Sequence, residues 1–121
     1  MATQFEAWLR GTDEQHLEAV AFAMWEEIDR IEMMLSRFDN RAEIARINRE
    51  ATSWPVRIDV ELFGILETCL AYCDSTSGSF NICRPDNLQN HQYLPSPQSI
   101  IELNKEARTV SIKNKAFCID L

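Results

Sequence analysis

Two polar corners of the sequence each carry an aromatic residue that could contact a ligand. Phe38 ends a run of helical periodicity and precedes the polar pair Asp39-Asn40. Its ring can either fill the core or offer a flat face to a planar ligand. The segment Ser79-Phe80-Asn81 directly follows Gly78. Backbone amides and the side-chain amide there could form a hydrogen-bonding corner, or the segment could be the entry of a strand with Phe80 buried.

The remaining reactive side chains are a carboxylate, two imidazoles and four thiols. Asp120 lies between Ile119 and Leu121, so its carboxylate either faces solvent or lies near a site. We expect His16 and His91 to face solvent. The cysteines form no Cys-x-x-Cys pair, and we expect them to be reduced packing residues: Cys69, Cys73, Cys83 and Cys118. The chain contains no Gly-rich phosphate loop, nucleophile elbow or metal motif.

Two long amphipathic helices should position these residues. Apolar residues recur every three or four positions from Leu17 to Leu35, which predicts a buried stripe on a helix that runs to about Arg37, with Thr12 as its cap. Asn40 should cap a short helix at 41–48. A second long helix should begin after Asp59 and end at Gly78.

The strands are predicted at the two ends of the chain. Residues 4–10 alternate between apolar and polar side chains, which predicts an N-terminal strand with Phe5, Ala7 and Leu9 buried. Residues 54–58 form a brief extended piece, and residues 84–99 a loop. Residues 100–103, 108–112 and 116–121 should form an antiparallel meander. The predicted fold is α+β, with the helices packed on one sheet.

Length and charge restrict the class of protein. A chain of 121 residues and 14.0 kDa is about one domain, which we assign to residues 1–121. A formal charge of −7 argues against nucleic acid as a partner. The first residues do not resemble a signal peptide, and no apolar run is long enough for a membrane span, so we expect a cytoplasmic protein.

The stretch around Phe38 resembles a motif of a known family, the ApbE-type FAD:protein FMN transferases. The family pattern is approximately L-S-x-[FY]-x-x-x-S-x-[IL]-x-x-[LF]-N. The chain departs from it with Ala42 in place of serine, has the similar aliphatic residue Ile47 at the [LF] position, and matches it at Leu35, Ser36, Phe38, Ile44 and Asn48.

Other landmarks of the same family occur in the same order. The opening Met1-Ala2-Thr3-Gln4-Phe5 is similar to the family's M-G-T-x-F, and Trp54-Pro55-Val56 followed by Asp59 is similar to its link into the next helix. Residues 78–83 resemble G-[AG]-[FM]-D-[IVP]-T, with asparagine and cysteine replacing Asp and Thr. Ile119-Asp120-Leu121 resembles the family's [LV]-D-L.

The resemblance implies a flavin site. It implies that FAD contacts Met1, Phe38, Ser79, Phe80, Asn81 and Asp120. In the family, magnesium assists attack by a threonine hydroxyl of a target protein on the FAD pyrophosphate, which links FMN to that protein and releases AMP. The family's Lys-Gly and magnesium-binding motifs would lie beyond Leu121, so we assign no catalytic residue and no metal ligand.

Two interpretations remain open at the level of sequence. The chain is either the N-terminal portion of an FMN transferase, truncated or partial, or a non-catalytic flavin-binding or protein-interaction module. In the second case we expect a homodimer or marginal stability, because exposed strand edges and helix faces favour association.

Overall fold

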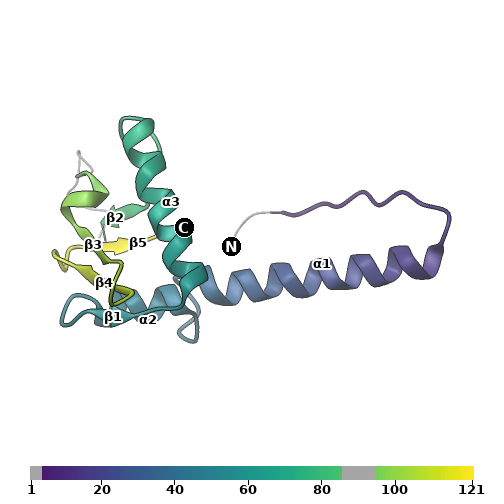
Figure 1. Ribbon diagram of the computed structural model, residues 1–121, viewed down its shortest axis with the longest axis horizontal. Helices are drawn as coiled ribbons and strands as arrows, with labels where there is room; N and C mark the ends of the chain where they lie inside the picture. The colour runs from purple at the N-terminus through teal and green to yellow at the C-terminus, as the bar shows by residue number, and fades with distance from the viewer. Residues whose placement is uncertain (1–3, 86–94) are drawn as a thin grey trace.

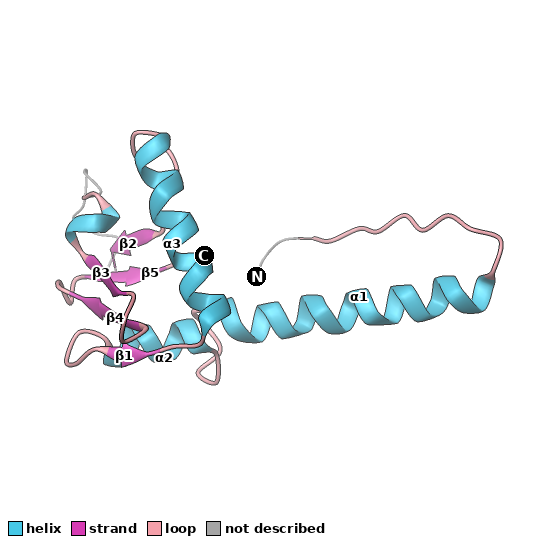
Figure 2. Cartoon of the chain, in the orientation of Figure 1, coloured by secondary structure: helices cyan, strands magenta, loops and turns pink. Residues whose placement is uncertain are grey.

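The computed structural model describes residues 4–85 and 95–121. Its two shorter α-helices lie beside a small group of strands (Figure 1). The longest helix projects away from the rest of the molecule, whereas the other elements gather at its C-terminal end (Figure 2). The elements are α1 (Glu14–Leu35), α2 (Glu43–Glu50), β1 (Val56–Arg57), α3 (Val60–Ser75), β2 (Cys83–Pro85), the 3-10 helix η1 (Pro97–Ser99), β3 (Ile101–Asn104), β4 (Thr109–Ile112) and β5 (Phe117–Ile119).

The described strands form two antiparallel groups, one in the order β1-β4-β3 and one that pairs β2 with β5. The predicted hairpin between β3 and β4 is confirmed, with Ile101 opposite Ile112. The prediction of a three-stranded meander is wrong, because β5 pairs with β2 instead of β4. Strand β4 already has β1 on one edge and β3 on the other, so neither edge is free for β5.

The core lies where α2 and α3 cover the strands. Ile44 and Ile47 from α2 and Leu62 and Leu66 from α3 have no exposed surface. They belong to one apolar cluster that also includes Val110 of β4. The fold is therefore α+β, as predicted, with α2 and α3 supplying the helical side of the core.

Helix α1 buries less than the sequence predicts. Only Met34 among its residues is buried, and the expected stripe from Leu17 to Leu35 is half-buried. The helix is capped by Asp13, whose carboxylate accepts a hydrogen bond from the His16 backbone N–H at 3.1 Å, and not by Thr12. Most of α1 has no layer packed against it in Figure 1. No helix among the described residues is long and apolar enough to cross a membrane.

The predicted strand at residues 4–10 is wrong. The segment is extended but pairs with no described strand, and all of its residues are exposed, including Trp8 at 92%. It folds back beside the first turns of α1, where Leu9 and Leu17 line the same shallow pocket. Alternation indicates that one face of a segment is apolar, but a strand also needs a sheet edge to pair with.

Helix α3 begins and ends where the sequence predicts. The Asp59 carboxylate accepts a hydrogen bond from the Leu62 backbone N–H at 2.9 Å, which caps the first turn. Past the other end, Gly78 has a φ of 82° and donates its N–H to the Cys73 carbonyl at 2.9 Å. The helix therefore delivers residues 79–81 at a fixed corner.

Candidate flavin-contacting site

The link between α1 and α2 turns Phe38 outward. After α1 ends, the Ser36 hydroxyl accepts hydrogen bonds from the backbone N–H groups of Phe38 (3.3 Å) and Asp39 (3.1 Å). These bonds tighten the turn in the manner of a helix cap. The Phe38 side chain is left 79% exposed, so it is not part of the core.

Asp39 fixes the second half of the same link. Its carboxylate accepts three hydrogen bonds from Arg41, one from the backbone and two from the guanidinium. The hydrogen bonds from the side chain and then the backbone of Arg41 lower the pKa of Asp39 to about 2. Its carbonyl accepts from the Ala42 N–H at 2.9 Å, and Ala42 itself is the N-cap of α2, in place of the predicted Asn40.

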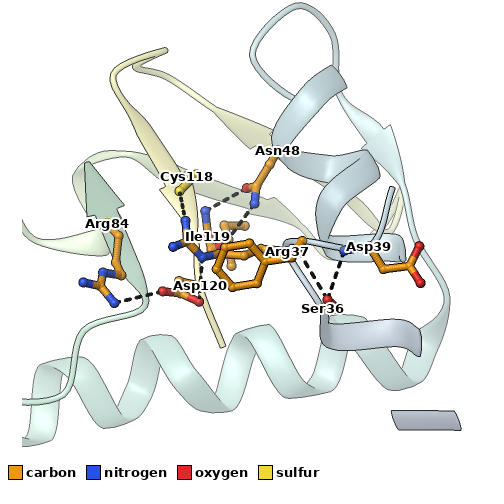
Figure 3. Close-up of polar contacts among 9 residues, drawn as sticks. Ser36, Arg37, Asp39, Asn48, Arg84, Cys118, Ile119 and Asp120 are labelled. Carbon is orange, nitrogen blue, oxygen red and sulfur yellow. Dashed lines mark hydrogen bonds and ion pairs between the residues drawn. The ribbon is translucent and has the colours of Figure 1, made fainter. Parts of the chain in front are cut away.

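Arg37 contacts the exposed Phe38 ring, and it also extends toward Cys118 and Asp120 (Figure 3). The central carbon of its guanidinium is 4.3 Å from the centroid of the Phe38 ring. Its Nε is 3.2 Å from Asp120 Oδ1, and one terminal nitrogen donates to Cys118 Sγ at 3.8 Å. The buried Nε has no hydrogen-bond partner among the described residues, so its contact with Asp120 is an ion pair without a hydrogen bond.

Asp120 joins three segments of the chain. Its Oδ2 accepts a hydrogen bond from Arg84 on β2 at 3.2 Å, and its backbone N–H donates to the Ile82 carbonyl at 2.9 Å. The Asp120 side chain is 22% exposed and the Arg37 side chain 28%. The carboxylate therefore does not point freely into solvent, and it connects β2 with the α1–α2 link.

Asn48 of α2 fixes the strand that precedes Asp120. Its side chain accepts a hydrogen bond from the Ile119 N–H at 2.7 Å and donates one to the Ile119 carbonyl at 2.8 Å. An amide side chain can satisfy both backbone groups in this way because it carries one acceptor and a donor. The motif residue Asn48 thus sets the position of β5 relative to α2 (Figure 3).

The Asn81 side chain is occupied by the backbone around it. It accepts a hydrogen bond from the Cys83 N–H at 2.8 Å and donates one to the Pro95 carbonyl at 3.2 Å. The amide therefore holds the entry of β2 against the segment before η1.

Burial raises the pKa of the Cys83 thiol to about 12, with the neighbouring Cys118 and Cys73 adding to the shift.

Phe80 lies along α3, and Ser79 beside it is exposed. Phe80 is 42% exposed, so the alternative in which it is buried is wrong. Its ring lies 6.3 Å from that of Tyr72 in an edge-to-face arrangement. Both rings line a groove of about 620 Å³ along α3, together with Glu61, Gly64, Ile65, Thr68 and Cys69.

The structure brings some of the proposed contacts together and separates others. Phe38 and Asp120 are joined through Arg37, and the backbone next to Asn81 is joined to Asp120 through Ile82. Within residues 4–85 and 95–121, no hydrogen bond or ring contact joins Phe38 to Ser79 or Phe80. Met1 lies outside the described residues, and so does His91, whereas His16 is exposed as predicted.

Sequence reasoning did not find Arg37 and Arg84 as members of this site. Arg37 occupies a position between Ser36 and Phe38 that the family motif leaves undefined, and Arg84 follows Cys83 on β2. Both side chains contact Asp120, which is distant in sequence from each of them. The only local signal of such a role was that Arg37 directly precedes an aromatic residue, Phe38.

The chain was compared with known proteins. A family model described as the ApbE family matches residues 1–117, and no curated protein matches the chain. The crystal structure of the ApbE protein from Thermotoga maritima MSB8 is similar in fold, with a TM-score of 0.71 and 20% sequence identity over 92% of this chain. The match covers 41% of that protein, so this chain spans less than half of its length. Because the family model covers nearly every residue, the chain belongs to the ApbE family.

Proposed function

We propose that this chain forms one wall of the flavin site of an FAD:protein FMN transferase, which transfers FMN from FAD to a threonine or serine of a target protein. In this proposal the described residues bind the isoalloxazine ring, and no step of the transfer is assigned to them. The observation that carries the proposal is the Phe38 ring, which is 79% exposed on a link fixed by hydrogen bonds.

An exposed phenylalanine on a fixed turn favours a planar ligand. Stacking an isoalloxazine on Phe38 would remove apolar surface of both rings from water. The Ser36 hydroxyl holds the turn before any ligand binds, so little ordering would be needed on binding. The match of this stretch to the family motif supports the same ligand.

The charges around the link favour one orientation of FAD. The chain carries a net charge of −7, but Arg37 and Arg84 converge on the single carboxylate of Asp120, which leaves a local excess of positive charge. A pocket of about 350 Å³ beside the same link is acidic, and its lining comprises Asp29, Glu32, Met33, Ser36 and Asp39. We expect the anionic pyrophosphate to lie toward Arg84 and away from the acidic pocket.

No ligand of the magnesium ion that the family reaction uses is assigned to the described residues. Magnesium usually keeps several waters and binds through one or two carboxylates together with substrate phosphates. No group of three His, Cys, Asp or Glu side chains in the described part of the chain could hold a metal ion. Both oxygens of Asp120 already contact arginines. No step of the transfer is therefore assigned to a metal held by these residues.

Titration with FAD, with and without magnesium, tests the proposal. We expect binding that does not need magnesium, and we expect Phe38→Ala to weaken it about tenfold or more because a stacking face is lost. Phe22→Ala is the matched control, since Phe22 is another exposed phenylalanine, at 65%, on the projecting helix α1. Absence of binding, or equal loss in both variants, would remove the flavin site.

A second candidate is a protein-interaction module that forms a homodimer. The observation in its favour is the exposed apolar surface of α1, where Phe22, Trp25 and Met33 are 65%, 46% and 41% exposed. Monomeric proteins rarely expose several large apolar side chains on one element. The oligomeric state in solution distinguishes this candidate from the flavin site.

A further inference from the structure

One face of the Phe38 ring is already covered in the structure. The Arg37 guanidinium lies over the ring, with its central carbon 4.3 Å from the centroid. A cation at this distance is attracted by the electron density of the ring face. Because the Phe38 side chain is nevertheless 79% exposed, the opposite face is open to solvent. A planar ligand can therefore stack on one side only.

Asp120 fixes Arg37 in this position. Its Oδ1 is 3.2 Å from Arg37 Nε, and its Oδ2 accepts from Arg84 at 3.2 Å, so neither oxygen lacks a cationic partner. The Asp120 backbone is tied to Ile82 by a 2.9 Å hydrogen bond. An ion pair whose side chains are only 28% and 22% exposed is screened less than a surface pair.

We propose that Asp120 is a positioning residue that acts on the flavin through Arg37. It holds the guanidinium against the back of Phe38, and this fixes the ring as a one-sided platform for the isoalloxazine. The inference rests on the flavin site proposed above. It differs from the direct contact between Asp120 and FAD that the family resemblance implies, because both carboxylate oxygens are already engaged.

A double-mutant cycle separates the indirect role from a direct one. Arg37→Met keeps the aliphatic stem and removes the guanidinium, whereas Asp120→Asn removes the charge that holds it. We expect each variant to weaken the binding of FAD about two- to fivefold, the range of a cation–π contact. If Asp120 acts through Arg37, the double variant binds no more weakly than either single variant.

Riboflavin provides a probe for the ring alone, because it has the isoalloxazine but no phosphate. We expect the same two- to fivefold weakening of binding (about 0.5–1 kcal/mol) for riboflavin in the Arg37 and Asp120 variants. The quenching of riboflavin fluorescence on binding measures the affinity. Arg49→Met is the control, since it removes an exposed guanidinium that pairs with Glu50 and not with Asp120. We expect it to change riboflavin affinity less than about twofold. Thermal melts of all variants show that they are folded.

Each outcome has a distinct meaning. Additive losses in the double variant would overturn the proposal and show that Asp120 acts independently of Arg37, while the flavin site would stand. Losses for FAD without losses for riboflavin would also overturn it, because Arg37 would then serve the phosphates. If the wild-type chain binds neither flavin, the proposed function fails, and this inference fails with it.

Discussion

Asn48 shows how one side chain can decide the position of a strand. The residue belongs to the stretch that resembles the family motif, and its side chain is bonded to the backbone of Ile119. Ile119 is fully buried, so water cannot replace these two hydrogen bonds. Asn48 therefore helps to place Asp120, the next residue, against Arg37 and Arg84.

We therefore expect Asn48→Ala to lower the free energy of unfolding by about 2–4 kcal/mol, because it leaves two buried backbone groups without partners. Urea denaturation followed by circular dichroism measures the loss. Asn114→Ala is the control, since the Asn114 side chain accepts a single hydrogen bond, from Ala116, in an exposed turn. A loss for Asn48→Ala no larger than the loss for this control would show that the two hydrogen bonds do not stabilise β5.

The partners of each residue also explain how much of the candidate site the sequence could predict. Phe38 and Asp120 stood out because an aromatic at a helix exit and a carboxylate in an apolar strand are unusual on their own. Arg37 and Arg84 did not, because their role depends on a partner far along the chain. Asn81 was correctly placed at a corner, but no local pattern could predict that its amide bonds to Cys83 and Pro95.

Among the elements, α3 is specified by signals at both of its ends. Asp59 caps its first turn, and Gly78 provides the left-handed residue after its last turn, with a φ of 82°. A second glycine, Gly64, lies within the helix. A Cβ added at either glycine would meet no atom within 4 Å, so the two sites differ in backbone conformation and not in space.

Replacing each glycine by alanine should change stability in opposite directions. Gly78→Ala should lower the free energy of unfolding by about 1–2 kcal/mol, because an L-residue is strained at positive φ. Gly64→Ala should raise it by about 0.5–1 kcal/mol, because alanine is favoured inside a helix. Urea denaturation of the two variants checks both signs. A shift in the same direction for both would contradict the assignment of these backbone conformations.

The elements that the sequence predicted well are those with local signals. Helix α3 and the hairpin of β3 and β4 have caps, turns and periodicity within a few residues. The strand predicted at residues 4–10 and the meander through β5 failed because pairing depends on which sheet edges are free. Strand β4 has no free edge, and no described strand lies against residues 4–10. The alternation of apolar and polar residues along a segment does not indicate which sheet edges are free or which strand lies beside it.

In the molecule as a whole, α1 packs little against the other elements. A helix of 22 residues spans about 33 Å, and only Met34 among its side chains is buried. Near its C-terminal end it is attached to α3 by Arg30, which pairs with Glu61 at 2.7 Å. Isolated helices are marginally stable in water, and packing adds little stability to the outer turns of α1. We expect a second copy to cover the apolar surface around Phe22 and Trp25.

The charge of α1 predicts how such an association depends on salt. The helix carries one basic residue, Arg30, and six acidic residues, which are Glu14, Glu18, Glu26, Glu27, Asp29 and Glu32. Two copies that meet along α1 repel each other, and salt screens this repulsion while leaving apolar contacts intact. The dimer should therefore strengthen as the salt concentration rises, which is the reverse of an association that depends on ion pairs.

Light scattering coupled to size-exclusion chromatography, at low and high salt, measures this association. Phe22→Lys should raise the dissociation constant at least about tenfold, because it replaces a large apolar contact with a charge. Phe38→Ala should leave it unchanged, since Phe38 lies on the α1–α2 link and not on the exposed stretch of the helix. A chain that stays monomeric at high salt and keeps its full helix content would contradict the interaction-module candidate. The flavin site that we propose at Phe38 does not depend on that result, because Arg37, Asp120 and Arg84 all belong to one chain.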